Sequence, residues 1–367
     1  REALEALEEP WLEQVLVGRS LCLHHPITRA VALLPDAARE GAVAALPSRA
    51  ELVAAGLVLP SSDESASAAG TVAFSAPERP WCGAVGSRYR VSGGAVVSLV
   101  CDCAWLAPRL EAVLAPVACG GDATGAREVT VTISVGREGH YDFWVDGRSV
   151  RMDAGRANAR RLALNIVLVE ALRHLTVGAV VHGAAVGVSG RAVLLAGGTG
   201  AGKSTLALGL AARGFEHLSD DFIPLSVAGG EVHAFPLAAS VKAGSWPILA
   251  EDFPSLGTSR VFAFAERRVR YVDPNAGGVR PSGSRTPGLL VFPRFEAAGA
   301  PVLHSLTPEA ALAALLESGS EAAGSPPSLR PLAELVNTTP AFEMTYSSLG
   351  QAADTVMDLM RRGGAGE

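Results

Sequence analysis

A short glycine-rich run carries the clearest chemical signal in this sequence. It matches G-x-x-x-x-G-K-[ST], and its members are Gly197, Gly198, Thr199, Gly200, Ala201, Gly202, Lys203, Ser204 and Thr205. In such a run, glycines let successive backbone N–H groups turn toward phosphate oxygens, and the following helix N-terminus adds partial positive charge. Lys203 is expected to reach the β- and γ-phosphates, and the Ser204 hydroxyl to bind Mg²⁺. The run therefore predicts a site for a nucleoside triphosphate, ATP, with Mg²⁺.

Two adjacent carboxylates form the second chemical feature. Asp220 and Asp221 follow Lys203 after one helical segment, so we expect them on the strand that neighbours the strand before the glycine-rich run. Beside a triphosphate, one carboxylate can accept the proton of an attacking hydroxyl while its partner tunes it or holds metal. The alternative is a turn in which aspartate only caps backbone groups. With the glycine-rich run, the pair favours a kinase over a generic ATPase.

Two further basic residues, Lys242 and His182, are candidates for the site. Lys203 and Lys242 are the only lysines among 31 lysines and arginines, so each marks a place where a compact ammonium could be required. His182 interrupts an otherwise apolar segment. It could orient a carboxylate or contact phosphate, but a satisfied core histidine is the alternative. For Lys242 the alternative is an ordinary surface lysine.

Arginines downstream of the carboxylates could neutralise charge that develops during phosphoryl transfer. Arg267, Arg268 and Arg270 lie in one polar segment, AERRVRY. A solvated arginine face explains the same pattern equally well.

The elements that position these residues are readable from local pattern. Apolar residues at 192–196 predict a strand before the glycine-rich run, and residues 206–213 predict a helix after it, with Gly214 as its C′ residue. Residues 178–188 predict a strand pair or one long strand, and residues 222–227 predict another strand. This alternation indicates an α/β fold.

The region before this core is predicted to be mostly β. Residues 129–135, VTVTISV, alternate as a half-buried strand, and Asp146-Gly147 predicts a hairpin turn. A long helix is expected over 156–175. Its apolar stripe, which we expect to pack in the core, consists of Leu162, Ile166, Val169 and Leu172.

The two ends of the chain give weaker patterns. Residues 3–17 predict a short helix and residues 61–70 a linker. Near the other end, Thr307 and Pro308 predict the N-cap and N1 of a helix, and residues 317–331 predict a mobile loop. A strand at 341–346 and an amphipathic helix complete the pattern.

Composition limits the classes of function. The 367 residues carry a net charge of −6 with no basic block, which speaks against nucleic acid as a partner. No apolar run of about 18 residues predicts a membrane span, and the charged first residues do not resemble a signal peptide. Five cysteines without framework spacing fit the cytoplasm. Cys101 and Cys103 are interpreted as core thiols, and His24 and His25 as a loop or strand-edge pair.

The order of these motifs resembles the HPr kinase/phosphorylase family. The matching residues are VVHGAAV and LLAGGTGAGKSTLALGLAARGFEHLSDDFIPL, and the distal segments VHAFPLAASVKAG and TPGLLVFPRFEAAGAPVLHSLTPEAALAALL resemble a divergent branch of it. Some members of that branch are encoded with ribosomally made peptide pathways and phosphorylate a serine. The resemblance covers about residues 162–360. The arginine-glycine signature of true HPr kinases is absent downstream of the aspartates, so neither HPr as substrate nor phosphorolysis is predicted.

The resemblance implies an α/β fold: a P-loop kinase core of HPr kinase/PEP carboxykinase-like type with a mixed sheet, plus a smaller N-terminal α+β region. The units expected are a small α/β unit (1–60), a linker (61–70), a β-rich part (71–155) and the catalytic domain (156–367). Since HPr kinases form rings, a homo-oligomer is the assembly that the resemblance implies.

The resemblance also implies roles for residues. Asp220 would be the base toward a serine hydroxyl, Asp221 its supporting carboxylate and, with Ser204, a metal ligand. His182 would lie near the phosphates, and Lys242 would meet a phosphate or an acidic substrate. The predicted function is a Mg²⁺- and ATP-dependent serine kinase acting on a protein or peptide. The alternatives are a P-loop small-molecule kinase and a nucleotide-binding regulator or pseudokinase.

Overall fold

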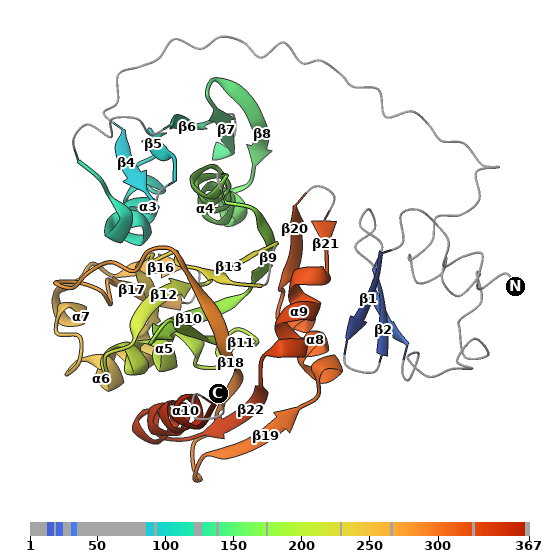
Figure 1. The fold of residues 1–367 in the computed structure, drawn as a ribbon. Helices are drawn as coiled ribbons and strands as arrows, with labels where there is room; N and C mark the ends of the chain where they lie inside the picture. The colour runs from blue at the N-terminus through green and yellow to red at the C-terminus, as the bar shows by residue number, and fades with distance from the viewer. Residues whose placement is uncertain are drawn as a thin grey trace, which may run out of the picture.

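The computed structural model describes residues 13–17, 20–24, 31–34, 86–91, 94–120, 127–136, 139–173, 175–227, 230–264, 267–324 and 327–363. Over these ranges the chain is a mixed α/β protein with one large sheet and three smaller ones (Figure 1). The predicted linker at 61–70, residues 3–12 of the predicted first helix, and His25 lie outside the described residues.

The large sheet has 11 strands and contains both parallel and antiparallel pairs. Its main path runs β12-β10-β11-β18-β14-β13-β9-β20-β21, and β22 joins β18 and β19. The strands are β9 (Val177–Val181), β10 (Gly183–Val188), β11 (Arg191–Ala196), β12 (Glu216–Asp220), β13 (Ile223–Ser226), β14 (Val232–His233), β18 (Ser284–Phe295), β19 (Val302–Leu306), β20 (Glu321–Gly324), β21 (Pro327–Ser328) and β22 (Ala341–Tyr346).

Helices cover both faces of this sheet. Along β11, Val193 and Leu195 pack with α5 (Lys203–Ala211) and α10 (Leu349–Gly363). The alternate residue Leu194 packs on the opposite face with α8 (Pro308–Glu317) and α9 (Arg330–Thr338). Because side chains alternate across a strand, an uninterrupted apolar run is what a strand covered on both faces requires.

A five-stranded sheet, in the order β4-β5-β6-β7-β8, forms the part before this core. Its strands are β4 (Ser87–Arg90), β5 (Val96–Cys101), β6 (Glu128–Val135), β7 (Tyr141–Val145) and β8 (Arg148–Ala154). Two helices, α3 (Ala107–Leu114) and α4 (Arg156–Leu172), cover one face of it, and a 3-10 turn, η2 (Ala115–Val117), follows α3. The boundary expected between residues 155 and 156 falls at the start of α4.

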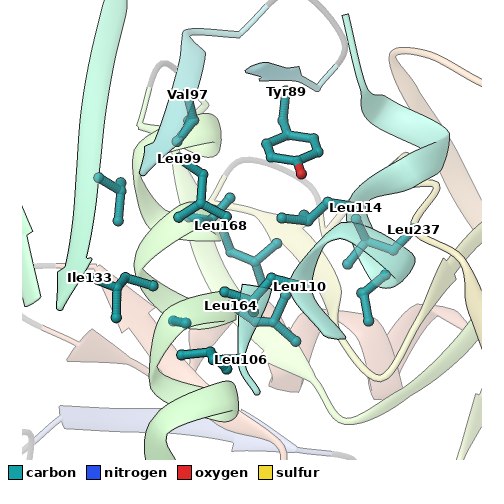
Figure 2. Close-up of a cluster of buried hydrophobic side chains, with 14 of the residues drawn as sticks. Tyr89, Val97, Leu99, Leu106, Leu110, Leu114, Ile133, Leu164, Leu168 and Leu237 are labelled. Carbon is teal, nitrogen blue, oxygen red and sulfur yellow. The ribbon is translucent and has the colours of Figure 1, made fainter. Parts of the chain in front are cut away.

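The core under α3 and α4 continues into the second half of the chain. Figure 2 shows Leu237, which follows β14, in the same cluster as Leu110 of α3 and Leu164 of α4. Phe235 also belongs to this cluster and is completely buried. Residues from both parts of the chain therefore pack together in this cluster.

Two small sheets complete the described structure. One has the order β15-β17-β16, from β15 (Ala239–Lys242), β16 (Phe262–Phe264) and β17 (Arg267–Val272), and the short helices η4 (Ala243–Ser245), α6 (Trp246–Leu249) and α7 (Ser255–Thr258) lie between β15 and β16 in the chain. The other is the antiparallel set β1 (Glu13–Val17), β2 (Ser20–His24) and β3 (Val31–Leu34). Val17 is buried in the same cluster as residues of α8 and α9.

Several local predictions are confirmed. Asp146 and Gly147 both have positive φ (48° and 76°) between the antiparallel strands β7 and β8. The Thr307 side chain caps α8 by accepting a hydrogen bond from Ala310 N at 3.3 Å. Gly214 has a φ of 92° after α5. These predictions were correct because each depends only on a few neighbouring residues.

The two cysteines of the C-x-C segment are core thiols, as interpreted from the sequence. Cys103 is buried, and Cys101 packs against the same cluster. His24 is the last residue of β2. Among the described residues, no helix combines the length and the apolarity that crossing a bilayer requires.

The placement of the aspartate strand was wrong. β10 lies between β12 and the strand β11 that precedes the glycine-rich run, and it pairs antiparallel with both. Of the two alternatives expected over 178–188, a strand pair or one long strand, the structure has two strands, β9 and β10, which break at His182 and pair with different partners. The sequence order of strands does not determine their order in a sheet, so one crossover helix did not make the two strands neighbours.

Three element predictions were also wrong. Residues 13–17 form a strand, not the end of a helix, and residues 321–324 of the expected mobile loop form β20, which pairs with β9. Val169 of the expected core stripe is 60% exposed, because α4 buries Ala163 and Val167 instead. In each case the tertiary partner, not the local pattern, decided the outcome.

Candidate active site

The glycine-rich run connects β11 to α5 with a backbone that requires glycine at several points. Gly197, Gly200 and Gly202 have φ values of 133°, 92° and 96°, which side-chain-bearing residues rarely adopt. The Lys203 ammonium donates hydrogen bonds to the carbonyl oxygens of Gly197 (2.6 Å) and Gly198 (3.0 Å). Burial lowers the pKa of Lys203 from its usual value. The loop thus folds around a buried ammonium.

A tyrosine from the far end of the chain fixes the end of this loop. A Cβ placed on Gly202 would lie 2.1 Å from the hydroxyl oxygen of Tyr346, the last residue of β22. Tyr346 is 3% exposed, and burial raises its pKa to about 12. Gly202 is therefore required by both its φ and its neighbour.

The carboxylate of Asp220 is buried, and each of its two oxygens accepts a hydrogen bond. Its Oδ1 accepts a hydrogen bond from the Ser204 hydroxyl (2.8 Å), and its Oδ2 accepts one from the backbone N–H of Ser240 (2.9 Å). The side chain is 4% exposed. Burial, followed by the negative charge of Asp221, raises the pKa of Asp220 to about 7. Asp220 thus ties β12 to the first turn of α5 and to β15.

Asp221 differs from its neighbour in backbone and exposure. It has a φ of 68°, in the left-handed region that aspartate tolerates better than most residues, and its side chain is partly exposed. The Nδ1 atom of His182 lies 3.1 Å from the carbonyl oxygen of Asp221. Since a carbonyl can only accept, this contact requires the proton on Nδ1. His182, at the break between β9 and β10, thus holds the turn that carries Asp221.

One cavity brings most of the predicted residues together. Its volume is about 350 Å³. It is lined by Arg160, His182, Thr199, Gly200, Ala201, Gly202, Lys203, Ser204, Thr205, Asp221, Ser240, Lys242, Ser245, Phe264, Arg267, Val269 and Tyr271. Asp220 is not among the lining residues, and Gly197 and Gly198 contribute through the carbonyls that hold Lys203.

The three candidate arginines of β17 separate in the structure. Arg267 lines the cavity. Arg268 and Arg270 lie over the Trp246 ring, with guanidinium carbons 5.6 and 4.5 Å from its centroid. A strand with alternating faces explains why neighbouring arginines do not share one role.

Sequence reasoning missed several residues of the cavity wall. Arg160 comes from α4, upstream of the glycine-rich run and the aspartate pair, and Phe264 and Tyr271 come from β16 and β17. The guanidinium carbon of Arg160 lies 5.2 Å from the Phe264 ring and 5.7 Å from the Tyr271 ring. No local pattern distinguishes an arginine that faces a cavity from one that faces solvent. Only the packing of α4 against this region reveals it.

The oxygen atoms around Ser204 suit a small hard cation. A hydroxyl and a carboxylate in direct contact are the donor types that Mg²⁺ uses, usually together with substrate phosphates. Across the described part of the chain, no group of three or more His, Cys, Asp or Glu side chains is arranged to hold a metal ion. The donor set at Ser204 and Asp220 fits Mg²⁺ bound partly by a nucleotide.

Comparison with known proteins gives little further information. No protein-family model matches the chain, and no curated protein matches it. Among solved structures, the chain is similar to the Hpr(Ser) kinase/phosphatase from Coxiella burnetii, with 13% identity over 51% of this chain and 96% of that one, and a TM-score of 0.25. At that TM-score and identity, the likeness says nothing about activity.

Proposed function

We propose that this chain is a kinase that transfers the γ-phosphoryl group of ATP, with Mg²⁺, to a serine hydroxyl of a protein or peptide. The observation that carries the proposal is the single cavity whose wall contains both the glycine-rich loop and Asp221, His182 and Lys242. A nucleotide loop alone is compatible with hydrolysis or signalling. A loop that shares a cavity with an accessible carboxylate can also activate a hydroxyl.

Asp221 is the better base of the pair. Both oxygens of Asp220 already accept hydrogen bonds, and that carboxylate lies outside the cavity wall. Asp221 lines the cavity and is partly exposed, so an acceptor hydroxyl can reach it. We therefore exchange the two roles expected from the sequence: Asp221 takes the proton, and Asp220 acts with Ser204 on the metal side.

The proposed step is an in-line displacement. The serine oxygen forms a bond to the γ-phosphorus while the bond from that phosphorus to the β–γ bridging oxygen breaks. The electron pair of the broken bond leaves with ADP, and the serine proton passes to the Asp221 carboxylate. His182 supports this step indirectly, because its contact with the Asp221 carbonyl holds the turn in its left-handed conformation.

The remaining charged residues of the wall would stabilise the transferring group. Lys203 would exchange its carbonyl contacts for phosphate oxygens, and Ser204 with Asp220 would hold Mg²⁺, which supplies neutralisation of phosphate charge when bound. Lys242, Arg160 and Arg267 add positive charge around the same cavity. Preorganised cations beside a phosphoryl group are the main source of catalysis in such transfers.

Serine as acceptor rests on the resemblance of the motif order to HPr-kinase-like proteins. The experiment is transfer from γ-labelled ATP to serine-containing peptides and, in parallel, to a set of small hydroxylated metabolites. We expect label on serine in the peptides. Label on a metabolite alone would replace this proposal with small-molecule kinase activity, and nucleotide binding without transfer would indicate a regulator.

The base assignment has its own test. Asp221→Asn keeps the shape of the side chain, so we expect Mg-ATP binding to persist while transfer falls by about 10²- to 10⁴-fold. Asp252→Asn removes an equal charge from an exposed site in the described chain and serves as the control. Full transfer activity in Asp221→Asn would exclude Asp221 as the base.

A further inference from the structure

Four arginines and four aromatic rings form a cluster that adjoins the proposed transfer site and shares part of its cavity wall. We call it the arginine–aromatic cluster; its members are Arg109, Arg156, Arg160, Arg260, Trp105, Phe262, Phe264 and Tyr271. Arg109 contacts three of the rings, with its guanidinium carbon 4.5 Å from Trp105, 5.6 Å from Phe262 and 5.4 Å from Phe264. Arg156 shares the Trp105 ring at 4.5 Å.

The positive charge of this cluster has no carboxylate partner among the described residues. None of its arginines forms an ion pair with a described Asp or Glu, whereas Arg280 and Arg285 elsewhere do. The Nε atoms of Arg109 and Arg160 are buried without a hydrogen-bond partner. Arg109 donates hydrogen bonds from its Nη atoms to the carbonyl oxygens of Trp105 (2.5 Å) and Ala263 (3.3 Å). The rings contact only the faces of the guanidinium groups, so the exposed Arg156 and Arg260 keep N–H donors for an anion.

Several arginines held close together must also repel one another. Burial and the charges of Arg156, Arg260 and Arg160 lower the pKa of Arg109. Such an arrangement is unfavourable in the free protein and becomes favourable when an anion binds, because each like-charge repulsion is then screened by a shared partner. The rings hold the guanidinium groups in position, which reduces the side-chain entropy that binding would cost.

The cluster is continuous with the proposed transfer site. Arg160, Phe264 and Tyr271 belong to both the cluster and the cavity wall. The Phe264 ring lies between the two sets, 5.2 Å from the Arg160 guanidinium and 5.4 Å from that of Arg109. A chain segment bound across the cluster can therefore present an adjacent residue to the cavity.

We propose that the arginine–aromatic cluster binds an acidic segment of the peptide or protein that accepts the phosphoryl group. This proposal rests on the proposed function, because it describes the acceptor of that transfer. Planar guanidinium forks match carboxylates, and the partly exposed rings of Trp105 and Phe264 suit the apolar parts of a peptide. The site thus selects a serine that has glutamate or aspartate residues near it in the sequence.

A nucleic acid is the competing anion. The chain carries a net charge of −6, and this cluster is local instead of extending as a basic stripe along one face. Phosphate backbones bind mainly through many distributed cations, so the observations favour a short acidic peptide.

The test uses a fluorescent peptide with one serine between glutamates and the same peptide with every glutamate replaced by glutamine. The double variant Arg156→Gln/Arg260→Gln changes the two exposed arginines of the cluster, and neither of them lines the cavity. We expect the wild type to prefer the glutamate peptide, and the variant to bind it about tenfold more weakly. The control Arg294→Gln/Arg361→Gln removes equal charge from other exposed sites and should bind like the wild type.

Separate readouts distinguish the two proposals. Mg-ATP binding should be unchanged in the double variant, and a loss of that binding would assign the cluster to the nucleotide and overturn the docking proposal. Equal binding of both peptides, binding of neither, an undiminished double variant, or preference for a single-stranded oligonucleotide would also overturn it. If the glutamate peptide binds through the cluster but no peptide is phosphorylated, docking stands and the kinase proposal fails.

Discussion

Two ionisable residues on β12 respond to pH in opposite directions. Asp220 has a pKa raised to about 7 by burial and by Asp221, and His217 has a pKa lowered to about 4 by complete burial. Neither ring nitrogen of His217 has a hydrogen-bond partner. Both shifts arise mainly because the two side chains are buried, where charged forms are penalised.

The signs of the two effects follow from proton linkage. Between the ordinary pKa of aspartate, 3.8, and about 7, the folded state holds the Asp220 proton that the unfolded state releases, so stability falls as pH rises. Between about 4 and the ordinary pKa of histidine, 6.5, the unfolded state holds the His217 proton that the folded state excludes, so stability rises with pH. The two slopes oppose each other over most of this range.

We therefore expect Asp220→Asn to leave only the contribution of His217, which makes the free energy of unfolding rise with pH. Without Mg²⁺ or nucleotide, the stability of this variant relative to wild type should rise between about pH 4 and about pH 7 by up to about 1.4 kcal/mol per pH unit. Urea unfolding at several pH values measures the difference. His217→Leu should remove the opposing term and leave a stability that falls with pH; parallel curves for the variants and wild type would contradict the assignment.

The ammonium of Lys203 gives a second residue-scale prediction. Replacing it by Lys203→Met removes the buried charge that the loop carbonyls hold at 2.6 and 3.0 Å. Since hydrogen bonds to charged groups contribute about 1.5–3 kcal/mol, Mg-ATP binding should weaken by about ten- to hundredfold. Isothermal titration calorimetry measures this, and a melting temperature near that of wild type verifies folding. An unchanged affinity for Mg-ATP would show that the loop is not part of a nucleotide site.

At the scale of elements, the contact between the glycine-rich loop and β22 is the sharpest feature. Gly202 and Gly200 share nearly the same positive φ, 96° and 92°. A Cβ on Gly202 would meet Tyr346, but a Cβ on Gly200 would have nothing within 4 Å. Comparing the same substitution at the two glycines therefore separates the cost of backbone strain from the cost of the steric contact with Tyr346.

We expect Gly202→Ala to destabilise the protein more than Gly200→Ala. Both carry the left-handed penalty of about 1–2 kcal/mol, and only the first adds overpacking of a further 1–3 kcal/mol. Adding Tyr346→Phe to Gly202→Ala should recover part of the second contribution, since the atom at 2.1 Å is the hydroxyl oxygen. Denaturant unfolding measures all three variants, and equal losses for both alanines would show that β22 does not constrain the loop.

At the scale of the whole molecule, the shared core joins the five-stranded sheet to the part of the chain that carries the candidate site. Phe235 is fully buried among residues of α3, α4 and β5–β7, although it follows β14 in the chain. A neighbouring backbone hydrogen bond from Ala238 N to Val113 O, 2.9 Å long, crosses the same boundary. The described parts before and after residue 175 should therefore unfold together.

Phe235→Ala tests this coupling. Removing a buried phenylalanine costs about 3–5 kcal/mol through lost burial and a residual cavity. Hydrogen exchange should speed up by a similar factor in β6 and in β11, while Val150→Ala, at a position 49% exposed, should change neither. Faster exchange confined to one side would show two independent folding units.

The sequence alone determined the features that depend on neighbouring residues. The Asp146-Gly147 hairpin and the Thr307 cap follow from short-range backbone chemistry, and the structure confirms both. The glycine-rich run lies between a strand and a helix, as its flanking residues predicted. The chemistry expected of Asp220 and Asp221 could be stated as a pair, because their residue types are visible. Their division of labour could not, because burial and cavity access are not local properties.

Only the tertiary structure decided which residues meet. It inserted β10 between the two strands that were expected to pair, and it brought Arg160 from α4 and Phe264 from β16 to the same cavity as the glycine-rich loop. It also buried Asp220 and left Asp221 on the cavity wall. Contacts between distant segments depend on how whole faces pack together, and no short stretch of sequence encodes them.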